Sequence, residues 1–140
     1  MAELTLAELS QKMRKIDFAM LSTHTEGEQI AARPMSNNGD VEYKGDSYYF
    51  TWEQSRTVRD IERNPKVSLS FQGAKKPLMI AVEGQAELIR DKAEFEAHWT
   101  KDLDRWFDDG VDSEGLVLIK VQATRIHYWD GEDEGELTVS

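Results

Sequence analysis

The feature of this sequence that most constrains its fold is a succession of short strand-like segments with little helix between them. In the clearest one, Val67, Leu69 and Phe71 alternate with Ser68 and Ser70, which is the pattern of a strand with one buried face. Such segments, joined mostly by turns, predict six or seven strands in a mainly antiparallel barrel with short flanking helices, an α+β (mainly β) fold. The other candidate strand segments are residues 18–23, 29–36, 41–44, 47–52, 78–89, 116–121 and 125–129.

Particular residues add detail to several of these strands. The segment 18–23 is small or apolar throughout, which predicts a strand buried on both faces. Pro34 requires that its strand lie at an edge or carry a bulge, and Gly84 predicts a bulge or sharp bend in the long segment around it. The segments 41–44 and 47–52, separated by Gly-Asp, are typical of a hairpin.

Three short helices interrupt the strands. Thr5 and Glu8 form a capping-box pattern at the start of a helix expected at residues 6–15. Ser55 and Asp91 are the N-cap residues expected for the second and third helices.

Composition narrows the class of protein. The 140 residues suffice for one domain, which we place at residues 1–131 with an acidic tail at 132–140. The net charge of −10 argues against partners that need a basic face, namely nucleic acids and anionic membranes. With no cysteine, disulfide scaffolds, Cys-ligated zinc and thiol catalysis are excluded. No apolar run approaches the roughly 18–20 residues of a membrane span, so we expect a cytoplasmic protein.

The pair Ser55-Arg56 is a candidate anion site. It stands where a helix is expected to begin, and the free backbone N–H groups of a helix start attract anions. The serine hydroxyl adds a donor, and the planar guanidinium of Arg56 is suited to a phosphate. The alternative is an ordinary N-cap beside a solvated arginine.

A second candidate is the run Arg33-Pro34-Met35. An arginine on a strand that is otherwise apolar needs an anionic partner if it points inward, and Pro34 leaves neighbouring backbone groups without ladder partners. A planar heterocycle with donors and acceptors on its edge would satisfy them. The alternative is a surface arginine on an edge strand.

The remaining chemical groups carry weaker signals. Trp106 and Phe107, ahead of an acidic turn, are candidates to pack over a flat ring, and the alternative is a core or dimer contact. His98 and His127 are candidate acid–base groups, with surface or capping roles as the alternative. No spacing of histidine and carboxylate residues predicts a metal site, and no catalytic residue can be identified.

The order of these motifs resembles that of a known family, the pyridoxamine-phosphate-oxidase-like FMN-binding split barrels, and is most similar to its general stress protein 26 branch. The motifs are Arg33-Pro34-Met35, Tyr49-Phe50-Thr51, Ser55-Arg56, Asn64-Pro65, Glu83-Gly84-Gln85-Ala86 and Tyr128-Trp129-Asp130. The resemblance implies that residues 1–131 form a six-stranded antiparallel Greek-key split barrel. It also implies a homodimer with two flavin sites at the subunit interface.

The resemblance assigns roles to residues by position. Ser55 and Arg56 would hold the phosphate of FMN, or the equivalent phosphate of FAD, and Trp106 would reach the cofactor of the partner subunit. Arg56 stands where the family often has lysine, and Asp108 stands where it often has proline, which puts the loop near Trp106 in question. The full implied set is Arg33, Pro34, Met35, Phe50, Thr51, Ser55, Arg56, Thr57 and Trp106.

The C-terminal residues argue against one reaction of the family. After Arg125 the chain has no lysine or arginine but several acidic residues, which would repel the phosphate of pyridoxamine phosphate. We therefore expect a flavin-binding protein of the general stress type, with any reaction being a flavin-dependent oxidoreduction. The alternatives are a dimeric binding module without cofactor and a haem-handling split barrel, for which His98 or His127 would be the axial ligand.

Overall fold

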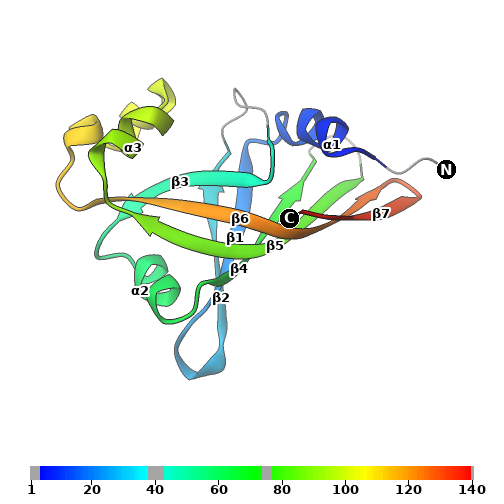
Figure 1. Ribbon diagram of the computed structural model, residues 1–140, viewed down its shortest axis with the longest axis horizontal. Helices are drawn as coiled ribbons and strands as arrows, with labels where there is room; N and C mark the ends of the chain where they lie inside the picture. Colours follow the sequence, from blue (N-terminus) through cyan, green and yellow to red (C-terminus); the bar gives the residue numbers. More distant parts are fainter. Residues whose placement is uncertain (1–3, 38–42, 74–76, 140) are drawn as a thin grey trace.

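The computed structural model describes residues 4–37, 43–73 and 77–139 (Figure 1). Three helices stand out from the sheet: α1 (Leu6–Met13), α2 (Arg56–Arg63) and α3 (Lys92–His98). Three short 3₁₀ turns are η1 (Glu26–Glu28), η2 (Lys101–Arg105) and η3 (Gly110–Asp112). The strands are β1 (Phe18–His24), β2 (Ile30–Ser36), β3 (Asp46–Trp52), β4 (Lys66–Gln72), β5 (Leu78–Ile89), β6 (Leu116–Asp130) and β7 (Asp133–Thr138).

One antiparallel sheet holds all these strands. Its order is β2-β1-β4-β5-β6-β3, and β7 pairs with β6 beyond that path. The sheet curls into a half-barrel with the short helices at its margins, which confirms the mainly β split-barrel fold expected from the sequence (Figure 1). Strand β2 ends the order and pairs only with β1 among the described strands, as Pro34 requires.

The helix starts expected from the sequence are also present. Thr5 and Glu8 make the capping box of α1, since the Thr5 hydroxyl accepts from the Glu8 backbone and the Glu8 carboxylate accepts from the Thr5 backbone. Ser55 caps α2 and Asp91 caps α3. No helix in the described residues is both long enough and apolar enough to span a membrane.

Two strand predictions were wrong. Residues 116–121 and 125–129 belong to one continuous strand, β6, which pairs along one edge with β5 and along the other with β3 and then β7. The predicted hairpin also fails, because β3 pairs with β6, and Tyr43 and Lys44 are not in a strand. Residues 41 and 42 of the expected strand lie outside the described residues. Local alternation indicates a strand but does not identify its partner.

Gly84 has the role its position predicts. The pairing of β5 with β6 shifts register between Glu83 and Gly84, and a β-carbon on Gly84 would collide with the backbone carbonyl of Gln122. The close approach of the two backbones at this bulge therefore requires glycine.

The core lies inside the curl of the sheet, and a smaller apolar cluster of Phe95, Phe107, Leu116 and Leu118 lies beneath α3. Strand β1 contributes to the main core from one face only. On its other face, Phe18 is 57% exposed and Met20 is 42% exposed. The expectation that this strand is buried on both faces was therefore wrong for the single chain.

Candidate functional site

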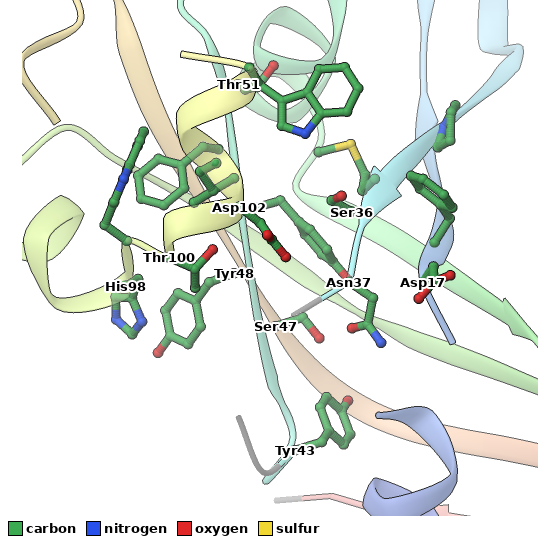
Figure 2. A pocket seen from close by; sticks show the side chains of 18 of the residues that line it. Asp17, Ser36, Asn37, Tyr43, Ser47, Tyr48, Thr51, His98, Thr100 and Asp102 are labelled. Atoms are coloured by element: carbon green, nitrogen blue, oxygen red, sulfur yellow. The ribbon is translucent and has the colours of Figure 1, made fainter. Parts of the chain in front are cut away.

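A deep hollow lies between β2 and β3, the two strands at opposite ends of the sheet order. This cavity has a volume of about 1000 Å³, which is the size range of small-molecule and cofactor sites. Its walls come from the end of α1, from β2 and β3, and from residues 97–107 (Figure 2). The split of the barrel is thus the site available to a ligand.

Most residues singled out from the sequence lie in the wall of this cavity. Ser55 and Arg56 are not in the wall. They stand at the start of α2, directly before Thr57, which is part of the wall. The wall residues among the expected set are Arg33, Pro34, Met35, Phe50, Thr51, Thr57 and Trp106.

The start of α2 is rich in hydrogen-bond donors. The Ser55 hydroxyl accepts from the Val58 backbone N–H at 3.3 Å and receives the Thr51 hydroxyl at 3.4 Å, so the N-cap interpretation of Ser55 is confirmed. Arg56 is exposed and Thr57 is buried. Within the described residues, neither side chain has a hydrogen-bond or ion-pair partner, so both remain available to an anion at this helix start.

Arg33 lies on the inward-facing side of β2, directly across from Leu21 of β1. Its Nη1 donates to the Thr23 hydroxyl at 2.8 Å and to the Leu21 carbonyl at 3.3 Å, and its Nη2 lies 3.6 Å from an oxygen of Asp60. Burial lowers the pKa of Arg33; the Asp60 charge opposes this shift, and the like charge of Arg56 adds to it. Arg33 and Arg56 are therefore close enough for their charges to interact.

Asp60 of α2 is the anionic partner that an inward arginine requires, and no motif in the sequence indicated it. Its side chain is fully buried and accepts the hydroxyls of Thr23 at 2.8 Å and Thr25 at 2.9 Å, and Arg63 at 2.9 Å. Burial alone would raise the pKa of Asp60, but these hydrogen bonds and the Arg33 charge outweigh it and lower the pKa. The available signal was a lone carboxylate on the apolar face of α2, between Val58 and Ile61.

Aromatic rings form the wall opposite β2. Phe50 lies edge-on to Trp99 and Phe107, with centroid separations of 4.9 and 6.3 Å, and Trp52 lies 4.9 Å from Phe107. Trp106 also lines the cavity but is 57% exposed. Such a wall offers an apolar aromatic surface, and its outermost ring remains open to a further partner.

Two buried tyrosines also line the cavity. Tyr43 and Tyr49 are buried, and their hydroxyls have no hydrogen-bond partner among the described residues. Burial raises the pKa of both, that of Tyr49 to about 12, so both stay protonated at neutral pH.

The two histidines considered from the sequence lie in different places. His98 lines the cavity, stacked on Tyr48 with ring centroids 3.7 Å apart. His127 is not in the wall; it stacks on Trp129, and its Nε2 lies 2.6 Å from Glu134. In the described part of the chain, no group of three histidine or carboxylate side chains is placed to hold a metal ion.

Comparison with known proteins agrees with this fold. The family model described as "Pyridoxamine 5'-phosphate oxidase like" matches residues 5–140. The chain therefore belongs to the pyridoxamine 5′-phosphate oxidase-like family, as its motifs indicated. A search of curated proteins gave no significant match.

Solved structures share the fold over nearly the whole chain. A Clostridium acetobutylicum protein related to general stress protein 26 has a TM-score of 0.83 at 19% identity, covering 96% of this chain and 94% of that one. General stress protein 26 of Bacillus anthracis has a TM-score of 0.74 at 26% identity, covering 91% and 93%. A heme binding protein from Mycobacterium smegmatis has a TM-score of 0.76 at 12% identity, covering 99% of this chain and 60% of that one.

Proposed function

We propose that this protein binds FMN in the cavity between β2 and β3, with the phosphate at the start of α2. The observation that carries the proposal is that Arg33 and Thr57 line the cavity at the start of α2, where Arg56 lies near enough for its charge to act on Arg33. Two like charges are unfavourable at short range unless an anion lies near them. FAD carries an equivalent phosphate, so the same groups would hold that cofactor.

The local charge fits a phosphate monoester. Arg33 and Arg63 pair with the single carboxylate of Asp60, and Arg56 interacts with Arg33. Three guanidinium groups and one carboxylate leave two positive charges in excess, which matches a dianion. In a chain with a net charge of −10, such a local excess concentrates attraction for an anion at one place.

The rest of the cavity suits a flat tricyclic ring. Pro34 and Met35 line one side, and the aromatic wall around Phe50 lines another, a combination that takes up planar ring systems. A bound flavin supplies hydride and single-electron transfer, chemistry that the side chains of this cysteine-free chain do not provide. We propose that any reaction of the protein is an oxidoreduction at this ring.

We further propose that a second copy of the chain closes the site. The outer face of β1 and β2 exposes Phe18, Met20 and Ile30, with Ile30 70% exposed, and Met20 lies directly across from Pro34. Phe18 and Pro34 belong both to this face and to the cavity wall. Exposed large apolar residues on one face are typical of a protein interface, and a partner on it would cover the open side of the cavity.

Oxidation of pyridoxamine phosphate remains disfavoured. Arg125 is the last lysine or arginine of the sequence, and it pairs with Glu83 at 2.7 Å and Glu136 at 3.1 Å. A substrate phosphate at this end of β6 would meet a neutralised arginine among the carboxylates of β7.

The absorption spectrum of the purified protein, before and after incubation with FMN and removal of free ligand, tests the proposal. We expect a flavin spectrum and release of FMN identified by mass. A protein that stays colourless after FMN loading would refute flavin binding and favour a binding module without cofactor. A haem band on titration with haemin, lost in His98→Ala, would favour the haem alternative instead.

A further inference from the structure

The carboxylate of Asp60 is fully used by the protein itself. One oxygen accepts the Thr25 hydroxyl and Arg63, each at 2.9 Å. The other accepts the Thr23 hydroxyl at 2.8 Å and lies 3.6 Å from Nη2 of Arg33. With its side chain fully buried and both oxygens engaged, Asp60 has no direction left for a ligand. Any influence on a ligand must pass through its partners.

Thr23 links this carboxylate to Arg33 by a directional chain. An ionised carboxylate only accepts hydrogen bonds, so the Thr23 hydroxyl must donate to Asp60. The lone pairs of that hydroxyl are then left for Nη1 of Arg33, which donates to it at 2.8 Å. The charge on Asp60 therefore fixes the orientation of Thr23, and Thr23 fixes one nitrogen of the guanidinium.

The same arrangement holds Arg33 against a repulsive neighbour. Arg56 lies near enough for its charge to act on Arg33, and without Asp60 the two guanidiniums would be driven apart. The Arg33 side chain keeps 20% of its surface exposed and lines the cavity. The Arg33 guanidinium is thus held by hydrogen bonds to protein groups, and the exposed part of the side chain faces the cavity.

We propose that Asp60 and Thr23 are positioning residues that hold the Arg33 guanidinium in the cavity wall, so that its free N–H groups meet the phosphate of the flavin. This inference rests on the proposed function for the identity of the ligand. The positioning itself is a property of the protein without ligand and has its own test.

The chain offers a matched pair of variants. Thr23→Val and Thr25→Val each remove one hydroxyl that donates to Asp60, but only Thr23 also contacts Arg33. Dissociation constants for FMN and for riboflavin, which lacks the phosphate, are measured for both variants and the wild type. Because a charge-assisted contact is lost, we expect Thr23→Val to weaken FMN by about tenfold relative to Thr25→Val, with riboflavin affinity unchanged. Equal effects of the two variants on FMN, or an equal loss for riboflavin, would overturn the inference.

A second readout needs no flavin. The side-chain Nε–H signal of Arg33, assigned by its loss in Arg33→Lys, is followed by NMR in the unliganded protein. We expect a sharp, slowly exchanging signal in the wild type and Thr25→Val, and a broadened one in Thr23→Val. Identical signals in all three proteins would overturn the positioning role. If the wild type failed to bind FMN while this pattern held, the proposed function would fall and the positioning role would stand.

Discussion

Replacement of Arg56 by alanine tests the position proposed for the flavin phosphate. Arg56 is exposed, and within the described residues it has no ion pair, so its removal leaves the fold intact. A charge-assisted hydrogen bond contributes about 1.5–3 kcal/mol, which is roughly 10- to 150-fold in affinity at about 1.4 kcal/mol per tenfold. Because solvent screens an exposed charge, we expect the lower end of this range, about tenfold weaker FMN binding.

The assay is a titration followed by quenching of flavin fluorescence, with riboflavin as the ligand that lacks a phosphate. Arg59→Ala is the matched control, since Arg59 is also exposed on α2 and its Nη1 donates to the backbone carbonyl of Gln54. We expect Arg56→Ala to weaken FMN but not riboflavin, and Arg59→Ala to change neither by more than a small factor. The FMN effect should shrink at high salt. Unchanged FMN affinity in Arg56→Ala, or equal losses in both variants, would refute the placement of the phosphate.

Three other predictions concern the fold and the assembly. Gly84→Ala should lower the midpoint of thermal unfolding, because its methyl group meets the carbonyl of Gln122 at the bulge; an unchanged midpoint would contradict the required close approach. The lowered pKa of Asp60 means that its stabilising contribution is complete above the ordinary carboxylate pKa and is lost as the pH falls through the folded-state value. Urea unfolding at decreasing pH should therefore show a smaller loss of stability in Asp60→Asn than in the wild type, and equal slopes would contradict this. Met20→Glu should convert a dimer to a monomer in light scattering, whereas Met79→Glu, at a methionine 45% exposed on β5, should not; a wild-type monomer would refute the proposed interface.

The sequence was sufficient to predict the fold where a local pattern determines the outcome. Alternation in β4, the capping box of α1 and the N-cap Ser55 are local signals, and each element formed as expected. The bulge at Gly84 was also predictable from the sequence, because only a glycine tolerates another backbone so close.

Strand partners and exposure were harder to predict, because they depend on the whole sheet. The alternating residues of β3 are compatible with a hairpin to residues 41–44 and equally with pairing to β6, and only the assembled sheet decides between them. Phe18 and Met20 made β1 resemble a strand buried on both faces, although both are exposed in the single chain. A large apolar residue is expected to be buried, but the residue alone does not indicate which surface buries it.

The candidate site could be predicted in part for a similar reason. The motif around Arg33 and the family resemblance, which implied Thr51 and Thr57, pointed to residues that the structure brings to one cavity. Asp60 escaped notice because a single aspartate in a polar helix carries no motif. Its role appears only when Thr23 of β1 and Arg33 of β2 are brought to it by the fold.

A crystal structure of the protein with FMN would test the central claim most directly. We expect the phosphate within hydrogen-bond distance of Arg33, Arg56 and the first backbone N–H groups of α2, with the ring in the cavity between β2 and β3. A phosphate bound elsewhere, with the two guanidiniums pointing away from it, would contradict the account.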